Sequence, residues 1–182
     1  MLCEIPVGPR EHRRLIPIIT DDYPDPDFGS GAVKITGAHD FNDYAVAQRH
    51  GIPLYVLMDG KARMREDGLP YAESAEIATR AARGKEVGDV SAVNLVPEEL
   101  RGLDRLEARR RVVEAITAEG LAVTDAEGRT VVEAKPIMQP FGDRSNVVVE
   151  PMLTDQWFVA TASIVGPAID AVRDGRVRIM PE

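Results

Sequence analysis

The spacing of apolar and polar residues is most regular around residue 40. Asp40 stands at an N-cap position, residues 41–50 follow with helical spacing, and Gly51 is a stop signal. Residues 32–36 before this segment and residues 54–57 after it are apolar runs of strand length. The pattern therefore predicts a strand, a tight turn, a short helix and a second strand.

The same periodicity predicts helices in three other places. They are expected at residues 73–82, 103–119 and 167–173. The helix over residues 103–119 carries its apolar residues on one stripe, and Gly120 ends it.

Short apolar segments in the rest of the chain are typical of strands. They lie at residues 5–7, 15–19, 121–124, 130–134, 147–149 and 177–180. Proline interrupts the first two, which favours edge strands, and residues 125–129 predict a hairpin turn. Many short strands with a few helices favour a mixed, β-rich α+β fold, a β-barrel decorated with helices, over a doubly wound sheet.

Composition narrows the class of protein. The chain has 182 residues, 44% of them hydrophobic and 29% charged, which is typical of one globular domain, or one domain with an appended arm. Its single cysteine, Cys3, excludes an internal disulfide and a cysteine-based zinc site. No apolar run reaches the roughly 18 residues of a membrane span, and no signal peptide opens the chain, so we expect no membrane partner and a cytoplasmic protein.

The charge balance argues against non-specific coating of nucleic acid. The chain has 22 Lys and Arg against 30 Asp and Glu, a net charge of −8. A local basic patch can still contact one structured nucleic acid. Arg101, Arg105 and Arg109 are the first candidates for such a patch, whereas the spacing of Glu107 and Arg111 favours an ordinary salt-bridged helix face.

Five residues that could bind a ligand or take part in catalysis lie in a stretch of ten positions that spans the predicted strand–helix turn. They are Lys34, Thr36, His39, Asp40 and Asp43. An ammonium, a hydroxyl, an imidazole and two carboxylates at a helix N-terminus could grip a zwitterionic small molecule. The structural alternative is that the first carboxylate only caps the helix, the second suits its dipole, and the imidazole is a hydrogen-bonding residue of the fold. With so few ligands in one segment we expect no metal site, and no phosphate-binding loop pattern is present.

The amino-acid sequence of several segments resembles that of the inserted editing domain of valyl-tRNA synthetases, which are class I aminoacyl-tRNA synthetases. The segments are GAVKIT at residues 31–36, AHDFNDY at 38–44, RHGIP at 49–53, PEELRGLDR at 97–105, FGDR at 141–144 and VEPMLTDQWF at 149–158. They are spread over almost the whole chain in the family's order. The resemblance implies the barrel-type editing fold over residues 1–160, with residues 161–182 returning toward the catalytic core.

The resemblance also implies a function. The parent enzyme attaches valine to its tRNA with ATP and Mg²⁺, but the HIGH and KMSKS motifs of that chemistry are absent from this chain. The fragment would need no cofactor and would hydrolyse the ester of threonine attached by mistake to the 3′ acceptor end of tRNA(Val). Threonine is nearly isosteric with valine, and an apolar pocket rejects an added hydroxyl only weakly, so a second, polar pocket is needed. Its partners would be that tRNA and the rest of the synthetase chain.

Residue roles follow from the same resemblance. Asp43 matches the acidic residue that holds the substrate's ammonium group, and it is catalytic in the sense of positioning the substrate. Asp40 and Thr36 match polar residues of the amino-acid pocket, and Lys34 matches a lysine near the ester or the terminal adenosine. His39 belongs to the motif without a clear role. A water molecule, oriented by these groups, would attack the ester.

The sequence departs from the family pattern in two places. Gly37 stands where the family usually has proline, which is expected to loosen the turn. The threonine-rich segment with an Arg-Pro-Glu-Thr core, which forms the facing wall of the family's pocket, is expected to lie upstream of this chain. Two alternatives therefore remain open: a non-catalytic module that binds the tRNA acceptor end, and a metal-dependent hydrolase that uses His39 and Asp40.

Overall fold

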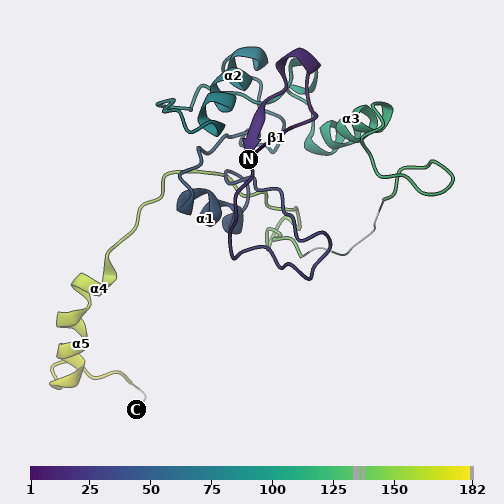
Figure 1. Ribbon diagram of the computed structural model, residues 1–182. Coiled ribbons are helices and arrows are strands. Elements are labelled where there is room, and N and C mark those ends of the chain that lie inside the picture. The colour runs from purple at the N-terminus through teal and green to yellow at the C-terminus, as the bar shows by residue number, and fades with distance from the viewer. Residues whose placement is uncertain (133–135, 137, 181–182) are drawn as a thin grey trace.

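A computed structural model describes residues 1–132, 136 and 138–180 (Figure 1). Its helices are α1 (Phe41–Arg49), α2 (Tyr71–Ala82), α3 (Arg105–Ala118), α4 (Thr161–Ile164) and α5 (Gly166–Arg173). Two 3-10 turns, η1 (Arg10–His12) and η2 (Glu98–Leu100), and two strands, β1 (Leu2–Glu4) and β2 (Leu15–Pro17), complete the regular elements of this described part.

The two strands form one antiparallel pair in which Cys3 lies opposite Ile16. Of the strands expected near the N-terminus, the one at residues 15–19 is confirmed over its first three residues, and the one at residues 5–7 is wrong, because β1 lies earlier. The described residues therefore have an α+β arrangement with a two-stranded sheet, and the predicted β-barrel is wrong. A barrel needs every strand to find two neighbours, and these short segments do not supply them.

Most of the other predicted strands are also wrong. No named strand forms at residues 32–36, 54–57, 121–124, 147–149 and 177–180. The nearest approach to pairing in or beside these segments is three isolated bridges, Met58–Met64, Thr124–Thr130 and Phe141–Val148. The turn at residues 125–129 is confirmed, since Asp125 accepts the backbone N–H groups of Glu127 and Arg129. The strand expected at residues 130–134 lies partly outside the described residues.

The helix predictions are confirmed, with shifts of one or two residues at some ends. Asp40 caps α1 by accepting the N–H groups of Asn42 and Asp43, at 2.8 Å and 3.0 Å. Gly51 follows α1 with φ of 60°, a left-handed conformation that glycine adopts without strain. Local signals of this kind act within a few residues, so they can be read from the sequence.

The best-packed region lies between α2 and the segment at residues 90–96. Ala78 of α2 packs with Val93 and Leu95, and Tyr55 covers this cluster. Asn94 is fully buried, and its side-chain amide donates to the backbone carbonyls of Arg65 and Asp67.

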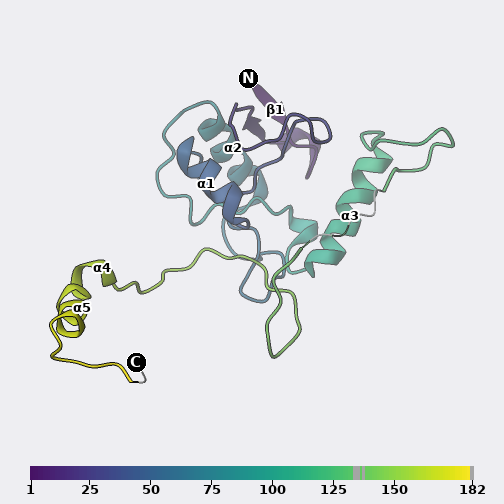
Figure 2. The same ribbon diagram turned by 90° about the horizontal axis from the view of Figure 1, so that it is seen from below.

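Helices α4 and α5 stand away from the rest of the protein in both views (Figures 1 and 2). They pack against each other, and the segment that leads to them is exposed, with Trp157 fully accessible to solvent. None of the helices in the described ranges combines the length and the apolar character needed to cross a bilayer.

Candidate functional site

The turn before α1 brings three of the predicted site residues together. Asp43 is buried, with 8% of its surface exposed, although it lies in the first turn of α1. Its Oδ2 accepts the backbone N–H of Thr36 at 2.6 Å, which ties the turn to the helix. The hydroxyl of Thr36 in turn accepts a hydrogen bond from the ammonium of Lys34.

Lys34 is held close to the Asp43 carboxylate without an ion pair shorter than 4 Å among the described residues. Desolvation lowers the pKa of Lys34 below its usual 10.5, while the nearby negative charge of Asp43 acts in the opposite direction. The side chain is nevertheless exposed along part of its length. The Lys34 ammonium and the Asp43 carboxylate both contact Thr36, and two opposite charges placed this way can bind a ligand that carries both charges.

Gly37 allows the turn to approach α1 closely. A Cβ atom at this position would lie 2.7 Å from the Cβ of Ala47 and 2.8 Å from a methyl carbon of Leu54. Such contacts are too short for any side chain, so glycine is required for this packing. The sequence suggested that this glycine loosens the turn; the structure shows that it lets the turn pack against the helix.

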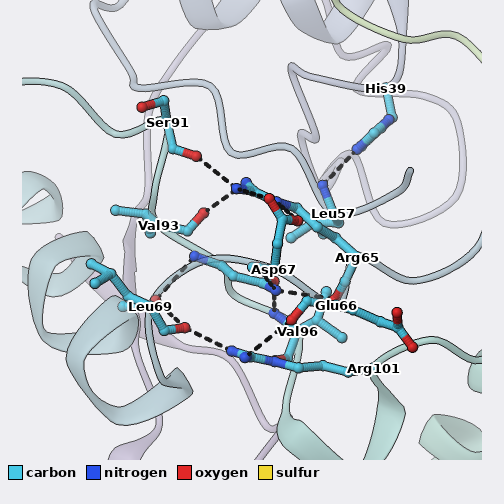
Figure 3. A network of polar contacts seen from close by, with 12 residues as sticks. His39, Leu57, Arg65, Glu66, Asp67, Leu69, Ser91, Val93, Val96 and Arg101 are labelled. Carbon is cyan, nitrogen blue, oxygen red and sulfur yellow. Dashed lines mark hydrogen bonds and ion pairs between the residues drawn. The ribbon is translucent and has the colours of Figure 1, made fainter. Parts of the chain in front are cut away.

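His39 joins two segments that are distant in the sequence. Its Nε2 accepts the backbone N–H of Leu57 at 2.9 Å (Figure 3), so its Nδ1 carries the proton and donates to the carbonyl of Pro151 at 3.2 Å. Desolvation lowers the pKa of His39 below 6.5, which keeps the ring neutral at pH 7. Both ring nitrogens are therefore occupied by the fold.

Asp40 is exposed and serves the cap of α1, as the structural alternative expected. Within the described residues no cluster of three or more His, Cys, Asp or Glu side chains could hold a metal ion. Both His39 nitrogens are engaged in bonds to the backbone, so His39 offers no free lone pair for a metal ion, whereas Asp40 uses only its Oδ1 for the cap.

A cleft of about 360 Å³ opens on the far side of His39. The cleft is lined by His39, residues 58–62, Arg105 and residues 147–152. Arg105 holds Glu150 by an ion pair of 2.5 Å, next to the Pro151 carbonyl that His39 binds. The cleft adjoins the turn, but Lys34, Thr36 and Asp43 do not line it.

The three arginines proposed to contact nucleic acid have different surroundings. Arg101 points inward, and its guanidinium donates to the carbonyls of Val96 and Leu69 at 3.1 Å and 2.7 Å (Figure 3). Arg105 is paired with Glu150. Arg109 is exposed on α3 and has no ion pair within the described part of the chain, so of the three it is the freest to meet a phosphate.

Arg14, which the sequence analysis did not single out, belongs to the same neighbourhood. It is half-buried beside Tyr55 and Tyr71, and its positive charge lowers the pKa of Lys34. Twenty residues separate Arg14 from Lys34, and no motif links them. The available signal was weak: two successive arginines, of which Arg14 directly precedes an apolar strand.

Comparison with known proteins gives the family context of this site. No family model matches the chain. Valine–tRNA ligase of Ruegeria pomeroyi is 63% identical over the whole chain, valine–tRNA ligase of Cereibacter sphaeroides is 47% identical over 93% of it, and that of Rhizorhabdus wittichii is 42% identical over 93%. The chain spans about 20%, 15% and 16% of the length of these relatives, respectively. The chain is thus homologous over its whole length to one segment of the valine–tRNA ligases.

Proposed function

We propose that this chain is the hydrolytic editing segment of a valine–tRNA ligase and that it cleaves threonine from wrongly charged tRNA(Val). The observation that supports the proposal is the buried Asp43 carboxylate beside Lys34 and Thr36 at the start of α1. One Asp43 oxygen holds the turn, and the other is left to accept the ammonium group of an amino acid. The relatives' name supplies the tRNA and the amino acid valine.

The reaction requires no protein nucleophile. Water adds to the ester carbonyl, the bond between the carbonyl carbon and the ribose oxygen breaks, and the released ribose oxygen takes up a proton that water loses and becomes a hydroxyl. Free threonine and intact tRNA result. Asp43 positions the ammonium group, so that the ester lies beside Lys34, whose ammonium can stabilise the developing negative charge on the carbonyl oxygen. The Thr36 hydroxyl can meet the hydroxyl of threonine, which valine lacks.

Deacylation of threonyl-tRNA(Val) and valyl-tRNA(Val) by the purified chain tests the proposal. We expect the threonyl ester to be hydrolysed and the valyl ester to be spared. Asp43→Asn keeps an acceptor for the Thr36 N–H but removes the charge, so it should lower the rate at least about tenfold, the loss expected when a charge-assisted hydrogen bond is removed. Asp170→Asn, on the distant helix α5, is the matched control and should leave the rate unchanged.

Two results would contradict the proposal. An unchanged rate of hydrolysis by the Asp43→Asn variant would mean that this carboxylate takes no part in the reaction. Binding of uncharged tRNA without hydrolysis of either ester would instead identify a module that holds the acceptor end, which is the competing interpretation. ATP and Mg²⁺ play no part in the assay, since ester hydrolysis is favourable without them.

A further inference from the structure

A long irregular segment connects β2 to α1. Residues 18–40 are all described by the structure, and none of them belongs to a helix or a strand. The backbone N–H groups of Phe28 and Gly31 donate to the carbonyls of Asp25 and Phe28, which lie in the segment itself. Most of residues 22–34 are exposed. Such a segment keeps one position where side chains fasten it to a rigid element, because ordering a loop costs conformational entropy.

Asp21 fastens one end of this segment to the C-terminal end of α1. Its Oδ1 accepts a hydrogen bond from Nη2 of Arg49 at 2.7 Å, and its Oδ2 accepts from Nε of Arg49 at 3.2 Å and from Nε2 of His50 at 2.9 Å. The backbone N–H of Tyr23 also donates to Oδ1, at 2.9 Å. Each oxygen of a carboxylate that is only 8% exposed therefore accepts two hydrogen bonds. A bidentate pair of arginine and carboxylate is strong and fixes the relative orientation of its partners.

Asp43 fastens the other end of the segment to the first turn of the same helix. Its Oδ2 accepts the N–H of Thr36 at 2.6 Å, and the hydroxyl of Thr36 accepts a hydrogen bond from Lys34. At a rise of about 1.5 Å per residue, Asp43 and Arg49 are separated by about 9 Å along the axis of α1. The segment is thus anchored at two points of one helix, and two of the candidate site residues lie at the second anchor.

We propose that Asp21 is a positioning residue for the reaction and that it keeps Lys34 beside Asp43 by holding the segment at residues 22–35. It acts through this segment and does not act on the ester. The inference rests on the proposed function for the role of Lys34, and it makes the reaction depend on a polar cluster at the opposite end of α1. Without the Asp21 carboxylate the segment loses its anchor there, so Lys34 samples more conformations and spends less time at the ester.

Amide hydrogen exchange and steady-state deacylation by the whole chain test this inference. In Asp21→Asn we expect the Thr36 amide to exchange at least about tenfold faster than in the parent chain. The amide of Val96, which is buried and bonded to Asn94, should exchange at the parent rate, which excludes global unfolding. With threonyl-tRNA(Val), kcat should fall about tenfold while KM stays nearly unchanged, because Asp43 still holds the ammonium group.

Two further variants make the comparison specific to this cluster. Asp27→Asn is the matched control, since it makes the same change of charge at an exposed carboxylate that accepts no hydrogen bond from the described residues. Its exchange and kcat should equal those of the parent chain. Arg49→Gln removes the bidentate partner and should reproduce the effects of Asp21→Asn. The variant that combines both substitutions should be no slower than either single variant.

The Lys34→Met variant separates positioning from a general loss of structure. If Asp21 acts through Lys34, adding Asp21→Asn to Lys34→Met should lower kcat no further, whereas a general loss of structure would multiply the two effects. Multiplied effects would overturn the inference, as would unchanged Thr36 exchange or unchanged kcat in Asp21→Asn. A parent chain that hydrolyses neither ester would refute the proposed function. In that case faster Thr36 exchange in Asp21→Asn would still support the anchoring of the segment by Asp21, and unchanged exchange would overturn it.

Discussion

His39 uses both ring nitrogens to join segments that are far apart in the chain. The stability of the fold should therefore depend on pH in the mildly acidic range. Protonation adds a hydrogen to Nε2, and the ring can then no longer accept the N–H of Leu57. The pKa of His39 is lowered in the folded chain relative to the ordinary 6.5, chiefly by desolvation. The unfolded chain therefore binds this proton more readily than the folded chain does.

The contribution of His39 to the free energy of unfolding should consequently be complete above pH 6.5 and should fall as the pH drops below that value. We expect the thermal midpoint to decrease between pH 7.5 and pH 5.5, and this decrease to be smaller in His39→Gln, which has no titrating ring. His12→Gln, at an exposed histidine, should retain the full pH dependence of the parent chain. Equal slopes for the His39 variant and the parent chain would show that other groups carry the effect.

Residues that act within one turn were predictable, and a residue that acts across the fold was not. The convergence of Lys34, Thr36 and Asp43 follows from their spacing around a turn that the sequence marks with glycine and an N-cap. Arg14, whose positive charge lowers the pKa of Lys34, lies 20 positions away from it in the sequence, and no local pattern links the two. The same limit applies to His39, whose partners lie 18 and 112 residues away.

At the scale of elements, the helices followed their sequence signals and the strands did not. A helix satisfies its hydrogen bonds within itself, so the cap at Asp40 and the stop at Gly51 suffice to place α1. A strand needs a second segment in register, and residues 32–36 and 54–57 find none. Apolar runs therefore indicated burial correctly in places, but they predicted more β-strands than the structure forms.

Asp40 caps α1 and is also predicted to contact the substrate, and substitutions can separate these two roles. Asp40→Ala removes the acceptor for two N–H groups and should lower the free energy of unfolding by about 1 kcal/mol in urea titrations. Asp40→Ser restores a capping oxygen and should recover most of that loss. If the serine variant also recovers deacylation of threonyl-tRNA(Val), Asp40 serves the helix alone; if stability returns without activity, its carboxylate also contacts the substrate.

At the scale of the whole molecule, the polar site belongs to the packed part of the chain, whereas the segment at residues 152–180 is largely exposed. Exposed apolar side chains continue through this segment into α4 and α5, and Trp157 and Phe158 are the bulkiest of them. The chain spans only 15% to 20% of the length of the homologous ligases. Apolar residues exposed together on a short, separated segment are typical of a surface that packs against another part of a larger protein.

Trp157 reports directly on this arrangement because it is the only tryptophan in the sequence. Its side chain is fully exposed, so the emission of the native chain should have the same maximum as the emission in concentrated urea, and acrylamide should quench both equally. Tyr71, which is 2% exposed, gives the internal contrast: its near-ultraviolet circular dichroism should be lost cooperatively on unfolding while the tryptophan emission stays constant. A native emission maximum shifted to shorter wavelength would mean that the indole is buried, either against this chain or against a second copy, and dilution would distinguish the two, since only contact with a second copy depends on concentration.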